Sequence, residues 1–391
     1  MADAAPTTAI KTVPKPRDQH LRDMADCIRF LSMDAVQQAK SGHPGAPSRM
    51  ADIATVLFRD FMQFDAADPH WFDRDRFVLS NGHASMLLYS LLYLTGYQDM
   101  TLDQLKRFRQ IDSKTAGHPE YKHADGIETT TGPLGQGVAN AAGFALAERI
   151  LNAKFGDDLC NHWTYVFMGD GCLMEGISEE AISMAGHYKL GHLIAFWDNN
   201  LITIDGATSL AVSDIELERF RASGWHVQEI DGHDTDAIRD AITAARAVTD
   251  RPSMIACKTI IGFGFPTKAG TQKAHSDAPG EEEIAGARKI LGWDAPPFVI
   301  PEPLLREWRE IGTKGRLARG LSRPCQKGAD RTALRVRASE RWEVNGRLEE
   351  GDRGGARRVH HERQGNGDPL CERRGARSSR RRHPGIAGRF R

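Results

Sequence analysis

The chain has 391 residues, of which 40% are hydrophobic and 27% charged, enough for one large domain or two. Its formal net charge of zero is the sum of two unlike parts: residues 1–315 carry 31 Lys and Arg against 43 Asp and Glu, whereas residues 316–391 carry 21 against 9. We find no signal peptide and no apolar run of the ~20 residues that a membrane span needs, which disfavours a membrane protein. The six cysteines include no C-x-x-C pair, so free thiols in a reducing cytoplasm are favoured over a disulfide framework or a zinc site.

The predicted elements alternate along the chain, after a flexible N-terminus at residues 1–17. Helices are predicted where apolar residues recur with the helical period, over residues 18–40, 50–62, 84–94, 133–155, 175–190 and 236–248. Short apolar runs predict strands over residues 76–80, 163–168, 192–198, 226–230 and 254–258. This alternation indicates one α/β domain in residues 18–315, with a doubly wound, mainly parallel sheet flanked by helices.

Two polar motifs end successive predicted strands. Gly169-Asp170-Gly171 follows the first, and Asn199-Asn200 follows the second after 27 intervening residues. Parallel strands joined by one helix end at the same edge of a sheet, so a carboxylate and an amide should meet there. Mg²⁺ prefers such oxygen ligands together with phosphate oxygens, and a helix start offers N–H groups to an anion. The spacing therefore predicts a diphosphate site; a capping aspartate beside a polar loop is the alternative.

Three loops place a histidine beside a glycine, at His43, His83 and His118. All are predicted at one flank of the sheet, where an imidazole can donate to phosphate or substrate hydroxyls and move protons near neutral pH. Solvated loop histidines are the alternative. The glycine loop 131–137 opens the helix predicted from Pro133, whose ring suits a first helical turn, and is a candidate backbone cradle for phosphates.

These motifs, in this order, resemble the transketolase family. The resemblance runs through residues 18–312 and rests on SGHPGAP at 41–47, LSNGH at 79–83, GHPE at 117–120, TGPLGQG at 131–137, GDGCL at 169–173 and NLITIDG at 200–206. The GDG and NN motifs alone are typical of thiamine diphosphate enzymes in general, whereas the histidine loops are typical of transketolase.

The resemblance implies a metal and a cofactor. Asp170, Asn200 and the backbone carbonyl of Ile202 would hold Mg²⁺ or Ca²⁺, which in turn binds the diphosphate of thiamine diphosphate. The residues in contact with the cofactor itself would be His83, Gly132, Pro133, Leu134, Gly171 and Asn200.

The resemblance also implies catalytic histidines. His43 and His118 would bind the hydroxyls of the donor ketose and assist proton transfer. The family uses a further histidine in the loop after the last predicted strand and often has it where Gln272 stands; His275 is the candidate in this chain.

The implied reaction is the reversible transfer of a two-carbon glycolaldehyde unit from a ketose phosphate to an aldose phosphate, through thiamine diphosphate, in the pentose phosphate pathway or the Calvin cycle. Transketolases are homodimers of three-domain chains, with each active site between the first domain of one subunit and the second domain of the other. Residues 18–315 resemble the first domain alone, so the chain is expected to be incomplete and inactive by itself.

Residues 316–391 do not resemble the family and contain 20 arginines. We expect a frameshift or truncation near Gly315 and a disordered tail. One alternative is the N-terminal subunit of a split transketolase; another is a basic-tailed binding protein built on a non-catalytic domain. Nucleic-acid binding is disfavoured because the tail lacks interleaved aromatic residues and any RNA-binding motif.

Overall fold

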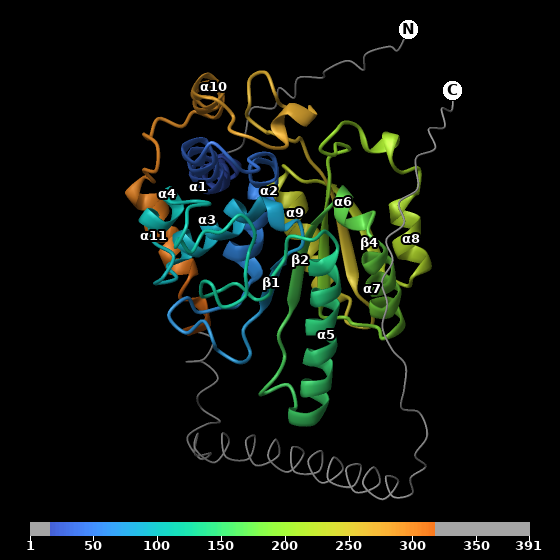
Figure 1. The fold of residues 1–391 in the computed structure, drawn as a ribbon. Helices are drawn as coiled ribbons and strands as arrows, with labels where there is room; N and C mark the ends of the chain where they lie inside the picture. Colours follow the sequence, from blue (N-terminus) through green and yellow to red (C-terminus); the bar gives the residue numbers. More distant parts are fainter. Residues whose placement is uncertain (1–15, 317–391) are drawn as a thin grey trace, which may run out of the picture. The chain divides into compact units, whose positions relative to one another are not determined.

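The computed structural model describes residues 16–316, all of which belong to one compact unit. Its centre is a sheet of parallel strands in the order β1-β2-β3-β5-β4 (Figure 1). The strands are β1 (Arg76–Leu79), β2 (Thr164–Gly169), β3 (Leu193–Asn199), β4 (His226–Asp231) and β5 (Ser253–Lys258). The predictions for residues 1–15 and for the tail beyond residue 316 lie outside the described residues.

Helices cover both faces of the sheet (Figure 1). The helices of the first half are α1 (Pro16–Ala39), α2 (Gly45–Val56), α3 (Ser85–Thr95), α4 (Leu102–Lys106) and α5 (Gln136–Phe155). Those of the second half are α6 (Asp170–Leu173), α7 (Gly176–His187), α8 (Glu216–Ala222), α9 (Thr235–Ala247), α10 (Glu281–Leu291) and α11 (Glu302–Ile311). None of the helices within residues 16–316 is long and apolar enough to span a bilayer.

Alternate residues of the strands pack into two separate hydrophobic cores, one on each face of the sheet. On β2, Tyr165 and Phe167 pack on the side of α1, α2, α3 and α9, whereas Val166 and Met168 pack on the side of α5 and α7. Both faces of a central parallel strand are therefore buried, which explains why its sequence is continuously apolar. The predicted α/β class, with a parallel sheet between helical layers, is confirmed.

The strand predictions agree with the structure to within one residue at every bound. The helix predictions were less accurate at their ends. The helix expected from residue 133 begins at Gln136, so Pro133 does not occupy its first turn. Gly135 precedes this helix with φ of 82°, a left-handed conformation that interrupts any helix starting earlier.

The helix expected over residues 50–62 begins earlier, at Gly45, and its last turn is a π-helix, Leu57–Phe61. The sequence 41–47 contains two prolines, but Pro47 stands in the first turn of α2, where its missing N–H has no helical acceptor to lose. As a result His43 lies two residues before the first residue of a helix, Gly45.

Candidate functional site

The predicted site residues follow the carboxyl ends of four neighbouring strands. His83 comes after β1, Asp170 after β2, Asn200 after β3, and His275 in the long loop after β5. Because these strands are parallel and adjacent, their following loops share one edge of the sheet, where open α/β folds bind ligands.

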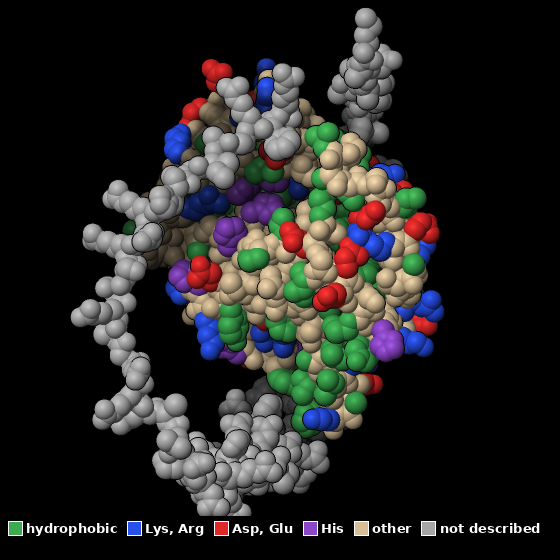
Figure 2. Space-filling model, turned by 45° about the vertical axis from the view of Figure 1, so that its right-hand side comes forward, with side chains coloured by type: hydrophobic (Ala, Val, Ile, Leu, Met, Phe, Trp, Pro, Cys, Tyr) green, Lys and Arg blue, Asp and Glu red, His purple; other side chains and the backbone are tan. Residues whose placement is uncertain are grey.

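Three histidines form a compact cluster. The ring centroids are 4.9 Å apart for His43 and His83, 5.6 Å for His43 and His275, and 5.4 Å for His83 and His275. Figure 2 shows histidine side chains gathered around a hollow in one face of the molecule. The sequence did not decide whether residue 272 or His275 corresponds to the further histidine of the family. In the structure His275 is the residue that lies beside His43 and His83.

Close backbone contacts hold these loops together. A Cβ added to Gly45 would lie 2.4 Å from the carbonyl oxygen of Ala274, so only glycine fits where the start of α2 meets the loop before His275. The N–H of Asp277 also donates to the carbonyl of Gly42 at 2.8 Å. The loops that carry His43 and His275 are therefore fixed to one another before any ligand binds.

His118 reaches the site on a second pair of loops. Its ring lies against Gly132, with Cγ 3.0 Å from the position of an added Cβ, and the Tyr89 hydroxyl donates to the His118 carbonyl at 3.1 Å. Gly82, next to His83, approaches the N–H of Gly132 so closely that a Cβ would lie 2.7 Å from it. Contacts thus run from His118 through the loop at 132 to the cluster, with the His118 side chain exposed to solvent.

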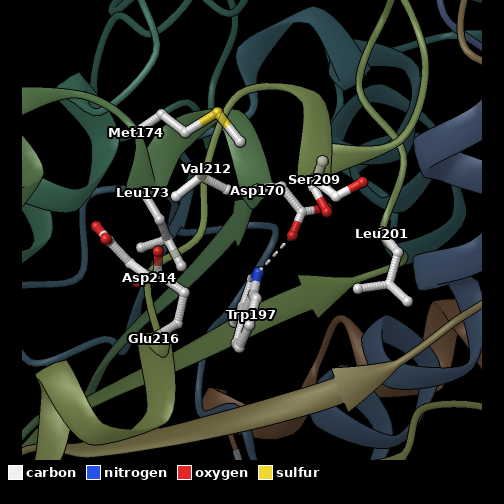
Figure 3. A pocket seen from close by; sticks show the side chains of 10 residues that line it. Asp170, Leu173, Met174, Trp197, Leu201, Ser209, Val212, Asp214 and Glu216 are labelled. Carbon is white, nitrogen blue, oxygen red and sulfur yellow. Dashed lines mark hydrogen bonds between the residues drawn. The ribbon is translucent and has the colours of Figure 1, made fainter.

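The proposed metal ligands also lie together. The Asn200 side-chain amide donates to Asp170 Oδ2 at 3.2 Å, and its Oδ1 accepts from the Ile202 N–H at 3.1 Å. The Trp197 indole donates to the other carboxylate oxygen of Asp170 at 3.1 Å, as Figure 3 shows. A cation between Asp170 and Asn200 would require the amide to turn so that Oδ1 replaces Nδ2.

The predicted cofactor contacts at residues 132–134 adjoin the Asp170 loop. A Cβ on Gly171 would lie 3.0 Å from a methyl carbon of Leu134, so the two segments touch. Pro133 is exposed and Leu134 half-buried. Asp170 also lines a pocket that includes Met174, Leu201 and Asp214, and none of the clustered histidines lines it (Figure 3).

Burial and mutual repulsion keep the histidines neutral. Burial, followed by the charge of Arg109, lowers the pKa of His43 to about 4, and burial followed by Arg49 lowers that of His275 to about 4. Burial, with His43 and His275 next in effect, lowers the pKa of His83 well below its usual value. A neutral imidazole can accept a proton at one ring nitrogen and donate a hydrogen bond from the other.

Asp170 shows the opposite effect. Burial first, and then repulsion from Asp198, raise the pKa of Asp170 to about 7, while Arg49 and the bond from Trp197 oppose the shift. A buried carboxyl whose charge lacks a cationic partner is the type of group that a divalent cation stabilises in its ionised form.

Arg49 is a site residue that the sequence prediction missed. It is buried in α2 and forms an ion pair through Nε with the buried carboxylate of Asp198, whose other oxygen accepts from Thr259 at 2.5 Å. Its Nη1 is buried and unpaired within the described part of the chain. In the sequence Arg49 looks like an ordinary polar residue of a helix. Only the packing shows that this position is buried.

Some of the buried polar atoms without a partner lie around the same edge. Among residues 16–316, the buried side-chain atoms without a hydrogen-bond partner include Asn81 Oδ1, Thr131 Oγ1, His275 Nδ1 and Arg49 Nη1. Buried polar atoms are normally paired, so several orphans next to Gly82 and Gly132 indicate a polar ligand. The site offers carboxylate and amide oxygens to a cation, and imidazole and guanidinium donors to an anion. This combination suits a phosphorylated ligand with its metal.

The chain matches the family described as "Transketolase, thiamine diphosphate binding domain" over residues 20–321. It belongs to the transketolase family. The match includes every predicted site residue, so a thiamine diphosphate-binding domain is the established assignment of this region, while the individual contacts stay predictions.

Sequence relatives and solved structures agree with this assignment. The chain is 58% identical over 296 residues to transketolase from Cereibacter sphaeroides; the match covers 76% of this chain and 45% of that relative. It is 59% identical over 299 residues to transketolase 2 from Escherichia coli, where the match covers 75% of this chain and 45% of the relative. The transketolase structure from Leishmania mexicana superposes with a TM-score of 0.75 at 44% identity, over 77% of this chain and 46% of that one. The structure from Campylobacter jejuni superposes with a TM-score of 0.77 at 43% identity, over 81% of this chain and 50% of that one. The chain thus spans about half the length of these transketolases.

We predict that Arg49→Met destabilises the transketolase domain by about 3–5 kcal/mol, because it leaves the carboxylate of Asp198 buried without its partner. Urea unfolding measures the effect. The double variant Arg49→Met/Asp198→Asn should recover most of the loss, and Arg251→Met, which breaks an exposed pair with Asp250, should leave the unfolding midpoint unchanged. A small loss in Arg49→Met would mean that Asp198 is not desolvated.

We also predict that the contribution of His43 and His275 to stability is lost as pH decreases from about 6.5 to about 4, whereas buried Asp170, whose pKa is raised to about 7, acts in the opposite direction. The unfolded chain binds protons at His43 and His275 near the ordinary histidine pKa of 6.5, whereas the folded domain binds them only near 4, so acid favours the unfolded state across this window. The double variant His43→Asn/His275→Asn should flatten the profile of unfolding midpoint against pH. His70→Asn, at a side chain 85% exposed, should leave it unchanged; equal profiles for all three proteins would contradict the prediction.

Proposed function

We propose that residues 18–315 bind the diphosphate of thiamine diphosphate with Mg²⁺ or Ca²⁺ and serve the transketolase reaction on ketose and aldose phosphates. The observation that carries the proposal is the convergence, at one sheet edge, of the Asp170–Asn200 pair with the cluster of His43, His83 and His275. Family membership makes thiamine diphosphate the ligand to test first.

The metal would lie between Asp170, Asn200 and the Ile202 carbonyl. The raised pKa of Asp170 supports this assignment, because a cation would replace the proton that burial favours. Gly171 leaves room for a phosphate beside it, and the half-buried His83 would donate to the diphosphate. Arg49, one guanidinium nitrogen of which is unpaired, adds fixed positive charge behind these groups.

When bound, thiamine diphosphate supplies the carbanion chemistry that breaks the carbon–carbon bond of the ketose. His43, His118 and His275 would bind substrate hydroxyls and move protons as alkoxides develop and collapse. Arg109 orients the first of them: its Nη2 lies 3.4 Å from His43 Nδ1, and its Nη1 donates to Ser41 at 2.7 Å. Acid–base groups placed in this way are worth about 10²–10⁴ in rate.

A second polypeptide surface would complete the site. Apolar side chains around the Asp170 pocket stand exposed, with Met174 at 37%, Leu201 at 62% and Leu210 at 79%. Such a patch beside a polar pocket is typical of a surface that another domain or subunit covers. This supports a homodimer in the full-length enzyme, as the resemblance implies, with Glu175 facing the other subunit. The half-length match is equally what the N-terminal subunit of a split transketolase would give.

We predict that Asp170→Ala, made in a complete version of this protein that includes the second domain, weakens Mg²⁺-dependent binding of thiamine diphosphate more than ~100-fold, because a missing metal ligand costs more than a disturbed second shell. Titration calorimetry with and without Mg²⁺ measures the loss. Asp214→Ala is the matched control, since this carboxylate lines the same pocket but is 61% exposed and pairs with Arg219 at 3.5 Å. Equal affinities in wild type and Asp170→Ala would contradict the assignment.

We further predict that the purified 391-residue chain gives no ketol transfer from a ketose phosphate to an aldose phosphate with thiamine diphosphate and Mg²⁺ present. The family resemblance places the activating glutamate and the contacts to the pyrimidine ring in the second domain. Addition of the portion of Escherichia coli transketolase 2 that follows the matched region should restore turnover if a partner chain can complete the site. Robust turnover by the chain alone would show that groups within it replace that domain.

A further inference from the structure

A second cluster of metal-binding side chains lies at the opposite, amino edge of the sheet. Asp73 stands shortly before β1, and Cys160 and His162 stand shortly before β2. The parallel register that pairs Arg76 with Thr164 brings these two segments side by side. Six strand residues separate this edge from Asp170, a distance of roughly 20 Å, so the cluster is separate from the candidate cofactor site.

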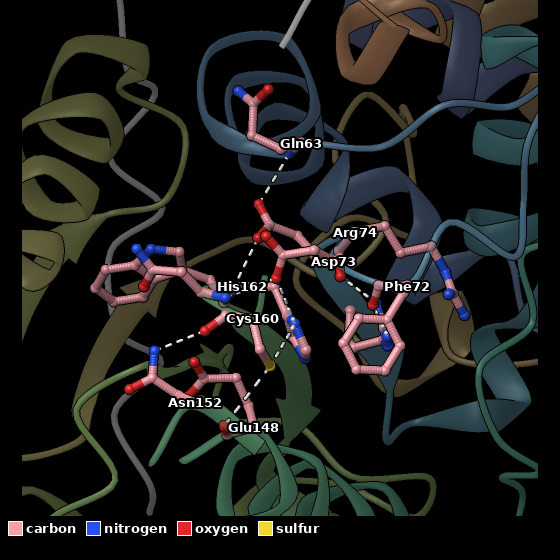
Figure 4. Close-up of polar contacts among 12 residues, drawn as sticks. Gln63, Phe72, Asp73, Arg74, Glu148, Asn152, Cys160 and His162 are labelled. Carbon is pink, nitrogen blue, oxygen red and sulfur yellow. Dashed lines mark hydrogen bonds and ion pairs between the residues drawn. The ribbon is translucent and has the colours of Figure 1, made fainter. Parts of the chain in front are cut away.

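The three side chains converge on one point (Figure 4). Asp73 Oδ1 lies 3.1 Å from His162 Nδ1, Cys160 Sγ lies 3.8 Å from the same nitrogen, and one ligand atom from each residue falls within 4.8 Å of the other two. Around a tetrahedral Zn²⁺ with bonds of about 2.0–2.3 Å, neighbouring ligand atoms stand roughly 3.3–3.8 Å apart. The observed separations need little adjustment to reach these values.

The backbone around the cluster is already fixed. The Asn161 N–H donates to Asp73 Oδ1 at 2.7 Å, and the Asn152 side chain donates to the Cys160 carbonyl at 2.6 Å. Cys160 and His162 are both buried, while the side chain of Asp73 is 26% exposed, which leaves a route for an ion from solvent. Such preorganisation lowers the cost of binding a metal.

The geometry argues against a nucleophilic role for Cys160. In a nucleophile–histidine–carboxylate relay, the nucleophile and the carboxylate use different ring nitrogens. Here both Cys160 and Asp73 approach Nδ1 of His162, so the carboxylate cannot orient the ring for a proton transfer from the thiol. Three donor atoms around one shared position is the arrangement of a metal site.

Charge balance is compatible with a divalent cation. A thiolate and a carboxylate neutralise two positive charges; the ion would replace the thiol proton, and the neutral imidazole of His162 would bind it through Nδ1 with its own proton on Nε2. Burial, then Glu148 and Asp73, raise the pKa of the Cys160 thiol to about 11, so without a metal the thiol stays protonated. Arg76 and Arg149 act in the other direction and disfavour a cation.

We propose that Asp73, Cys160 and His162 form a Zn²⁺ site that fastens the segment before β1 to the segment before β2. The carbonyl oxygen of Glu148, 3.7 Å from Cys160 Sγ, or a water would complete a four-coordinate shell. The ligands come from two segments about 90 residues apart, with a Cys-x-His spacing in the second, so no sequence motif marks the site.

Cobalt(II) provides a specific test, because a cobalt–thiolate bond produces a charge-transfer band that nitrogen and oxygen ligands do not. The full chain is used with Cys325→Ser and Cys371→Ser, so that cysteines outside residues 16–316 cannot contribute. We expect a thiolate band that Zn²⁺ abolishes, and an increase in the thermal unfolding midpoint with Zn²⁺. The histidine cluster at the other edge can also bind Co²⁺, but without a cysteine it gives no such band.

Three variants and a control decide the outcome. Cys160→Ser should lose the band and reduce the Zn²⁺-dependent stabilisation to what the histidine cluster alone provides, and Asp73→Asn and His162→Gln should weaken the Co²⁺ binding that the band reports by more than ~10-fold. Cys27→Ser, which changes another buried thiol, should keep both signals. Absence of the band in the parent chain, or its persistence in Cys160→Ser with circular dichroism unchanged, would overturn the proposal. If His162→Gln fails to fold, the isosteric Cys160→Ser still decides.

Discussion

The parallel pairing of β1, β2, β3 and β5 is the constraint on which the candidate site depends. Parallel strands place their carboxyl ends at one edge, and each of these four strands is followed by a loop with a polar residue of the site. The helices between the strands bury their apolar sides on the two faces and leave this edge uncovered. Glycines then allow the loops to meet, as where Gly82 approaches the backbone of Gly132 and Gly45 approaches that of Ala274.

Most of the fold could be predicted because burial leaves a plain mark on the sequence. A strand buried on both faces is continuously apolar, which is why β2 and β3 were placed within one residue. The start of α5 was wrong because a left-handed glycine, at residue 135, overrides the helical preference of Pro133. Gly135 also lies so close to Glu175 and Ser178, far along the chain, that an added Cβ would clash with them, and no local pattern reveals this contact.

The site was predicted less completely than the fold. Among residues inside recognisable motifs, His43 lies beside His83 and Asp170 lies beside Asn200. His275 could be chosen over Gln272 only from the ring positions, since the choice depends on how a 17-residue loop folds back onto α2. Arg49 was missed for another reason: its partner, Asp198, is 149 residues away, and a buried ion pair between distant segments has no sequence period.

The two edges of the sheet differ in how their polar groups are satisfied. At the amino edge, Asp73 and Asp75 accept backbone N–H groups from residues 161 and 163 and so join the segments before β1 and β2, although Thr164 Oγ1 there is buried without a partner among the described residues. At the carboxyl edge, Arg49 Nη1 and His275 Nδ1 are buried without partners, which costs stability in the isolated domain. A ligand that pairs with these groups would offset the cost of their desolvation through its binding free energy. The unpaired donors at the carboxyl edge are therefore available to an anionic ligand, whereas the carboxylates at the amino edge already join the segments before β1 and β2, where the proposed Zn²⁺ would bind.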